Sequence, residues 1–272
     1  MAVRRGTARG VGQVAAAIRM LTGIPMPADS RDLTGAAAYG LVGAMVGLLG
    51  GVVMLILGGT VPALAAILAV ATIAIVSGGI HLDGLADTMD ALLATDAARA
   101  EMARKDPAIG SGGAVGLILV LGTEVAALAA LAGPPGGAGP SHACLACIAA
   151  GSASRALPVV LVQLRGNALS RGVVLSRGGL GSWFVDRVGG LDAATAAVTA
   201  GLAIALAGVA TGAVAFLAGA IVGAALGIGI GLVLVRARRQ IDGDMLGATV
   251  ELGFAAVVGA IAIGLSVTWP IR

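Results

Sequence analysis

Three aspartates stand close together in the run Gly79-Ile80-His81-Leu82-Asp83-Gly84-Leu85-Ala86-Asp87-Thr88-Met89-Asp90, which directly follows a long apolar segment. On an α-helix, Asp83, Asp87 and Asp90 occupy positions i, i+4 and i+7, so their carboxylates share one face. Like charges on one face repel one another, and oxygen ligands of this kind suit Mg²⁺ or Mn²⁺ shared with substrate phosphates. The run therefore predicts a metal site formed by these three aspartates; the alternative is a solvated acidic turn at the end of a membrane helix.

The composition indicates which class of protein must position this run. Hydrophobic residues make up 58% of the 272 residues, charged residues make up 11%, and the mean hydropathy is +1.02. In soluble domains about 25% of residues are charged. The 45 glycines suit transmembrane helices that pack closely through small residues. The basic residues are dispersed among apolar spans, which argues against nucleic-acid binding. We expect an all-α, polytopic helical bundle in the lipid bilayer, with residues 1–272 forming a single catalytic domain.

Stretches of about 20 apolar residues predict seven transmembrane helices. They cover residues 36–57, 61–80, 114–132, 141–162, 193–210, 212–235 and 248–269. The N-terminal arm and the connections 81–113, 163–192 and 236–247 carry 15 of the 17 Lys and Arg residues. The alternate connections, 58–60, 133–140 and the region around 211, carry no charged residue. By the positive-inside rule the basic segments are cytoplasmic, so the predicted active site lies on the cytoplasmic face.

The N-terminal arm contains an apolar stripe over residues 11–22. Gln13 and Arg19 interrupt this stripe, which is atypical of a signal peptide. Its apolar residues share one helical face, so we expect an interfacial helix that lies on the membrane surface. Pro25 and Pro27 end this helix and turn the chain toward the first span.

Two further polar segments lie at the cytoplasmic ends of predicted spans. The first precedes the third span and contributes Lys105, Asp106, Gly110 and Ser111. Free N–H groups at a helix start attract anions, so this segment resembles a phosphate site, although glycine-rich helix entries are also common without a ligand. In the second segment, Asp244 and Glu251 are seven residues apart and share one face at the mouth of the last span.

Two ionisable residues, Glu124 and Arg155, lie inside predicted spans, where such residues are costly and usually face the bundle interior. They could form a structural ion pair. Alternatively, Arg155 could use its bidentate donors to bind a substrate phosphate in a cavity open to the cytoplasm. The residues alone leave both interpretations open. His81, two residues before Asp83, could hydrogen-bond a substrate or a carboxylate.

The run GGIHLDGLADTMDAL resembles the signature of the cobalamin synthase family, the adenosylcobinamide-GDP ribazoletransferases. Four other blocks resemble that family in the same order. They are LTGIPMP at 21–27, KDPAIGSGG at 105–113, the pair Ser154-Arg155, and GDMLGA at 243–248 followed by Glu251. Two positions depart from the family pattern: Gly23 replaces the usual Arg, and Phe254 stands where an acidic residue is often found.

The resemblance implies a reaction that joins adenosylcobinamide-GDP to α-ribazole or its 5′-phosphate and releases GMP, in a prokaryotic plasma (inner) membrane. Mg²⁺ is the expected cofactor, with Mn²⁺ as an alternative, and assembly as a homo-oligomer stays open. Attack on a diphosphate needs charge neutralisation and positioning. Asp83 and Asp87, with Asp90, would hold the metal, and either Asp106 or Asp244 would accept the hydroxyl proton. The expected substrate-binding residues are His81, Lys105, Gly110, Ser111, Arg155 and Glu251.

Two other classes of membrane protein remain as alternatives. A CDP-alcohol phosphotransferase shares metal-bridged diphosphate chemistry, but its D-G-x-x-A-R pattern is absent, because Asp87-Thr88 stands where Ala-Arg should follow. A cation-coupled transporter would concentrate carboxylates at the membrane midplane. Here most acidic residues fall at the predicted cytoplasmic mouth and only Glu124 lies deep in a span.

Overall fold

The computed structural model describes residues 2–26, 33–94, 108–133, 138–168, 174–175, 180–238 and 240–268. The elements are α1 (Ala2–Leu21), η2 (Ala36–Ala38), α2 (Tyr39–Leu57), α3 (Pro62–Val76), α4 (Ile80–Leu93), α6 (Ser111–Ala132), α7 (Pro140–Ala168), β1 (Val174–Leu175), α8 (Leu180–Arg187), α9 (Gly190–Thr211), α10 (Val214–Arg238), β2 (Gln240–Ile241) and α11 (Gly243–Thr268). The two short strands pair in parallel, Val174 with Gln240 and Leu175 with Ile241. The predicted all-α class is confirmed, since every other described element is a helix.

Within the described residues, six helices are long and apolar enough to cross a membrane, and the number rises to seven if one bent helix pair counts as a span. The six cover Ala36–Leu57, Ser111–Ala132, Pro140–Leu164, Gly190–Thr211, Val214–Arg238 and Gly243–Val267. Their exposed surfaces carry large aliphatic side chains, as lipid contact requires. The chain is therefore a multi-pass membrane protein.

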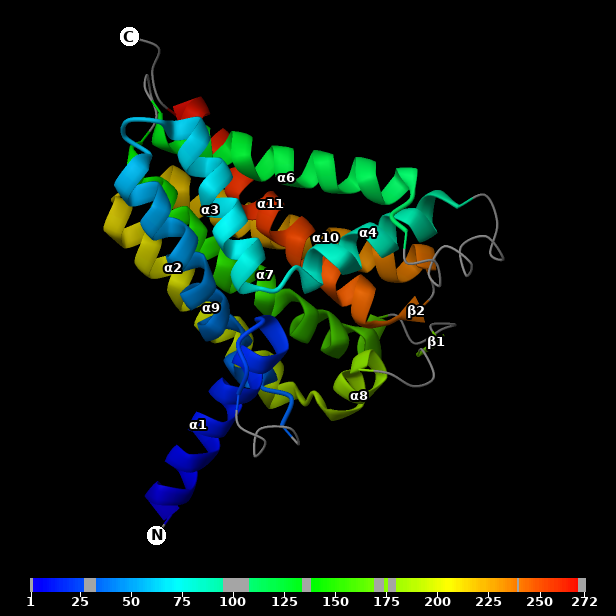
Figure 1. The fold of residues 1–272 in the computed structure, drawn as a ribbon. Helices are drawn as coiled ribbons and strands as arrows, with labels where there is room; N and C mark the ends of the chain where they lie inside the picture. The colour runs from blue at the N-terminus through cyan, green and yellow to red at the C-terminus, as the bar shows by residue number, and fades with distance from the viewer. Residues whose placement is uncertain are drawn as a thin grey trace.

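The predicted span 61–80 is the one that differs from the structure. Its helix, α3, ends at Val76, and α4 continues from Ile80 at an angle of 95°. The turn needs Gly78 and Gly79, whose φ angles of 65° and 71° are left-handed and unfavourable for residues with a Cβ. At 15 residues α3 is about 22 Å long, shorter than the roughly 30 Å hydrocarbon core. After the bend, the acidic helix α4 runs beside α6 and α11 (Figure 1).

The two ends of the bundle differ in character (Figure 1). The connections α2–α3, α6–α7 and α9–α10 gather at one end, together with the last turn of α11. The end of α4, the start of α6, the strand pair, α8 and the start of α11 gather at the opposite end. This arrangement agrees with the alternation that the charge pattern predicts. The cytoplasmic assignment of the second end stays a prediction.

Glycine allows the central helices to approach closely. Gly43 and Gly47 of α2 face the backbone of Gly151 and Cys147 of α7, and a Cβ at either glycine would overlap that backbone. A bulkier residue would force the two helices apart, so close packing of small residues sets their spacing. Helix α1 projects away from the bundle in Figure 1, and its C-terminal part packs on the bundle through Ala17 against Gly35. The interfacial placement of α1 stays a prediction.

Candidate active site

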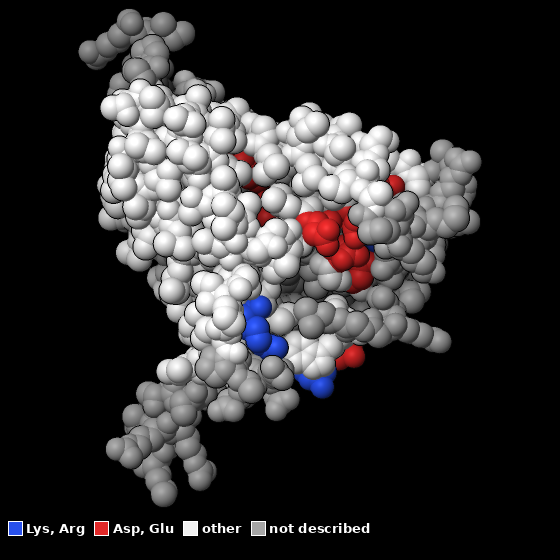
Figure 2. All heavy atoms as spheres, in the orientation of Figure 1, with Lys and Arg blue, Asp and Glu red and all other residues white. Residues whose placement is uncertain are grey.

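The predicted acidic face forms on α4. Asp83 is exposed and Asp87 and Asp90 are partly buried, while His81, Gly84 and Thr88 are buried. Gly84 packs on the backbone of Asp244, where an added Cβ would lie 2.7 Å from the carbonyl oxygen. This contact brings Asp244, at the start of α11, beside the acidic face. Figure 2 shows acidic atoms gathered in a hollow at this part of the surface, between α4 and the beginning of α11.

Asp90 caps helix α6. Its two carboxylate oxygens accept hydrogen bonds from the backbone N–H groups of Gly110 and Gly113, each at 2.8 Å. A Cβ at either glycine would meet this carboxylate, which explains why both positions are glycine. The helix start that was predicted to attract a phosphate thus binds a carboxylate of the protein itself. The predicted substrate contact of Gly110 must then compete with Asp90, and Ser111 is exposed beside it.

Asp242 and Arg238, which are not among the predicted site residues, fix the start of α11. The Asp242 carboxylate accepts the N–H of Met245 at 2.9 Å, as a helix N-cap does. Arg238 forms an ion pair with Asp242 at 3.1 Å and donates to the hydroxyl of Thr88 on α4 at 3.2 Å. These contacts bind α4, α10 and α11 together. No local pattern predicts a contact between residues 150 positions apart.

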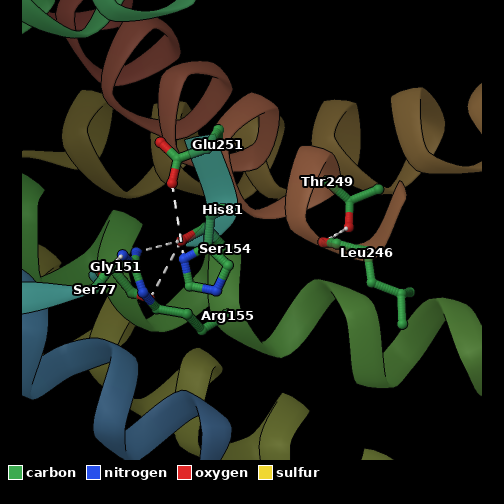
Figure 3. Close-up of polar contacts among 8 residues, drawn as sticks. All are labelled: Ser77, His81, Gly151, Ser154, Arg155, Leu246, Thr249 and Glu251. Atoms are coloured by element: carbon green, nitrogen blue, oxygen red, sulfur yellow. Dashed lines mark hydrogen bonds and ion pairs between the residues drawn. The ribbon is translucent and has the colours of Figure 1, made fainter. Parts of the chain in front are cut away.

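A group of buried polar side chains includes His81, which lies on the same helix as the acidic face (Figure 3). His81 Nδ1 lies 3.8 Å from Glu251 Oε1. Arg155 donates to the hydroxyl of Ser154 at 3.1 Å and to that of Ser77 at 3.4 Å. His81, Arg155 and Glu251 were predicted as site residues from the sequence, and they lie together in the structure. Ser77, at the end of α3, was not predicted, because it is 78 residues away from Arg155 in the chain.

Arg155 and Glu124 do not form a direct ion pair among the described residues. Arg155 is 1% exposed and interacts electrostatically with both Glu124 and Glu251. Glu124 Oε1, Arg155 Nε and His81 Nδ1 have no hydrogen-bond partner within the described part of the chain. Neighbouring side chains enclose the guanidinium in this conformation. They would have to move before a substrate phosphate could contact it.

A cavity of about 290 Å³ opens beside these groups. Residues of α1, α2, α4, α7, α8 and α11 line it, and its polar lining includes His81 and Asp244. Asp244 therefore borders both the acidic hollow and the cavity. Lys105 and Asp106 lie outside the described residues.

The carboxylates suit a hard divalent cation, although the described residues hold no group of three His, Cys, Asp or Glu side chains already arranged around a metal position. Asp83 and Asp87 lie one turn apart on α4, and Asp244 of α11 contacts the same helix at Gly84. Mg²⁺ is commonly held by only one or two protein carboxylates together with substrate phosphates and water. The donor set fits that mode of binding, in which the substrate completes the site.

Fold and site together define a multi-pass α-helical membrane protein with an acidic hollow and an adjoining cavity at one end of its bundle. The chain belongs to the cobalamin-5-phosphate synthase family, whose model matches residues 13–262.

Curated relatives agree with this family. The adenosylcobinamide-GDP ribazoletransferase of Shewanella pealeana is 41% identical over 112 residues, which cover 39% of this chain and 43% of the relative. The enzymes of the same name from Xanthobacter autotrophicus and Pseudomonas paraeruginosa are 38% and 36% identical, and the matches cover 42% of this chain and 47% and 49% of the relatives. The chain thus spans less than half the length of the curated relatives it matches. No solved structure matches.

Proposed function

We propose that this protein joins adenosylcobinamide-GDP to α-ribazole, or to α-ribazole 5′-phosphate, and releases GMP. The observation that carries the proposal is the acidic helix α4, set by the Gly78-Gly79 bend against the start of α11 in a chain of the cobalamin-5-phosphate synthase family. The names of the relatives supply the substrates, and the site supplies groups that suit diphosphate chemistry.

In the proposed reaction a ribose hydroxyl of α-ribazole attacks the phosphorus attached to the corrinoid. A new P–O bond forms, the P–O bond to GMP breaks, and the hydroxyl proton passes to a carboxylate. Asp244 is our proposed proton acceptor, because it lines the cavity and borders the acidic hollow. Asp106, the other sequence candidate, lies outside the described residues.

Asp83 and Asp87 are the proposed ligands of Mg²⁺, or of Mn²⁺ in its place. When bound, the cation would neutralise charge on the diphosphate and make GMP a better leaving group. Asp90, the third predicted ligand, supports this site through α6, since both of its oxygens accept backbone N–H groups. Lys105 is the proposed partner for the remaining negative charge.

The buried group of Arg155, His81 and Glu251 has a proposed positioning role. Arg155 contacts Ser77 at the end of α3, and His81 lies in the first turn of α4. We propose that this group stabilises the bend that positions Asp83 and Asp87. We further propose that the site faces the cytoplasm across a prokaryotic plasma membrane, because GDP-activated substrates are cytoplasmic.

The test is turnover of the purified protein in lipid nanodiscs. Adenosylcobinamide-GDP and α-ribazole are supplied with Mg²⁺, and GMP release is measured together with the corrinoid product. The proposal predicts equal amounts of GMP and of the joined product, and no GMP without α-ribazole. Equal GMP release with and without α-ribazole would identify hydrolysis instead. CMP release from a CDP-alcohol would identify a CDP-alcohol phosphotransferase.

A further inference from the structure

The cavity beside the site has an aromatic wall that the proposed chemistry does not yet use. Tyr39 of α2 and Phe184 of α8 stack with ring centroids 5.4 Å apart and an interplanar angle of 24°. Both line the cavity, and α11 contributes Leu246 and Val250 to it. The whole chain has one Tyr and three Phe residues, so two of these four aromatic residues meet at this cavity.

The polar lining of the cavity lies next to the acidic hollow. Besides the phenol of Tyr39, its ionisable lining residues are His81 and Asp244, and Asp244 also contacts α4 through Gly84. A molecule that occupies the cavity therefore has apolar and aromatic neighbours, and a polar end that reaches Asp244. Ligand sites of this type bind one planar, weakly polar ring system and fix its orientation with few polar contacts.

We propose that this cavity binds the aromatic base of the acceptor nucleoside, and that Tyr39, Phe184, Leu246 and Val250 set which base is accepted. The proposal rests on the proposed function, since it assigns one of the two substrates to the cavity. With the base held there, the ribose would lie toward Asp244, where its hydroxyl has to lose a proton.

The other substrate fits the cavity less well. A corrin ring is too large for about 290 Å³. Guanine carries several hydrogen-bonding groups, and burying them against Leu246, Val250 and two aromatic rings would leave some unpaired. Unpaired buried polar groups cost about 1–3 kcal/mol each, so an apolar slot selects against guanine. A benzimidazole-type base has the planar, mostly apolar surface that the slot matches.

Two substitutions on α11 test the assignment. Val250→Phe fills the cavity, and Leu246→Ala enlarges it. Leu252→Phe is the matched control, because it adds the same ring to the same helix at a partly buried position outside the cavity. KM values for both substrates are measured in nanodiscs, and binding of α-ribazole alone is measured by equilibrium dialysis with GMP as competitor.

We expect Val250→Phe to raise the KM and Kd for α-ribazole about tenfold or more, with the KM for adenosylcobinamide-GDP unchanged. Leu246→Ala should improve kcat/KM for nucleosides with a larger tricyclic base relative to α-ribazole. Leu252→Phe should change neither the KM for α-ribazole nor this base preference. If Val250→Phe fails to fold, the base preference of Leu246→Ala decides the question.

Three outcomes would overturn the assignment: an unchanged KM for α-ribazole in a folded Val250→Phe variant, an unchanged base preference in Leu246→Ala, or displacement of α-ribazole by GMP. Failure of the proposed function looks different. In that case the wild-type protein gives no GMP from the two substrates, while α-ribazole still binds and Val250→Phe still weakens that binding.

Discussion

The carboxylate of Asp90 on α4 accepts the backbone N–H of Gly113 on α6 at 2.8 Å, across 23 residues of sequence. Its second oxygen takes the N–H of Gly110 at the same distance. The third aspartate of the acidic run thus connects the helix that presents Asp83 and Asp87 to the glycine-rich segment that follows Lys105 and Asp106. Two motifs that are separate in the sequence form one unit in the fold.

We therefore expect Asp90→Ala to lower the stability of the protein more than its affinity for the metal. Loss of both acceptors at the start of α6 should lower the free energy of unfolding by about 1–2 kcal/mol, measured by thermal denaturation in nanodiscs. Asp90→Asn keeps one acceptor oxygen and serves as the milder control. The Mg²⁺ concentration for half-maximal turnover should stay within about twofold of wild type in Asp90→Asn. A large increase in that concentration with unchanged stability would instead make Asp90 a metal ligand.

Arg155 can be tested for its two possible roles. In the structural role, Arg155→Ala removes the donor to Ser154 and Ser77 and the positive charge that interacts with Glu124 and Glu251, and stability should fall by about 1–3 kcal/mol. Combination with Glu124→Gln should then recover part of that loss in a double-mutant cycle. We expect this result, because Arg155 is 1% exposed.

The substrate role of Arg155 makes the opposite prediction. Arg155→Lys keeps the charge but loses the bidentate donors. If Arg155 holds a phosphate of adenosylcobinamide-GDP, the KM for that substrate should rise in Arg155→Lys while the melting temperature stays unchanged, and Glu124→Gln should restore nothing. Measurement of KM and melting temperature in the same preparations separates the two roles.

Arg238 should be essential for the position of α4. Its guanidinium contacts Asp242 and Thr88, and both groups of its ion pair are less than 10% exposed. Arg238→Ala leaves Asp242 buried without this partner. The free energy of unfolding should therefore fall by about 3 kcal/mol, and the melting temperature should fall with it. Arg236→Ala, on the same helix with an exposed side chain, is the matched control and should change stability little. Equal melting temperatures for the two variants would show that the contact does not hold the helices together.

Membrane topology can be checked by cysteine labelling in a background in which Ala replaces the buried Cys144 and Cys147. Asp186 of α8 and Thr60 in the α2–α3 connection are exposed, and these two elements lie at opposite ends of the bundle in Figure 1. A cysteine at position 186 should react with an impermeant reagent only after the membrane is opened, whereas one at position 60 should react in intact cells. Labelling of position 186 from outside would reverse the orientation and place the acidic hollow away from cytoplasmic nucleotides.

The sequence was sufficient for those features that depend on local periodicity. Apolar runs located the six long helices, and helical spacing placed Asp83 and Asp87 on one face. The 95° bend was not predicted, because the apolar run continues through Ser77 and the glycine pair that turns the chain is common in a sequence with 45 glycines. Neither the Arg155–Ser77 contact nor the Arg238–Thr88 contact leaves any local signal, since each joins residues far apart in the chain.

The most direct measurement is GMP release from adenosylcobinamide-GDP and α-ribazole as a function of Mg²⁺ concentration, for the wild-type protein, Asp83→Asn and Asp87→Asn. Each substitution keeps the shape of the side chain and removes one charge from α4. We expect Mg²⁺-dependent release in the wild type, its abolition by EDTA, and a loss of about 100-fold or more in each variant, with melting temperatures near wild type. Full activity of the wild type in EDTA, or wild-type turnover by a folded Asp83→Asn variant, would contradict the account.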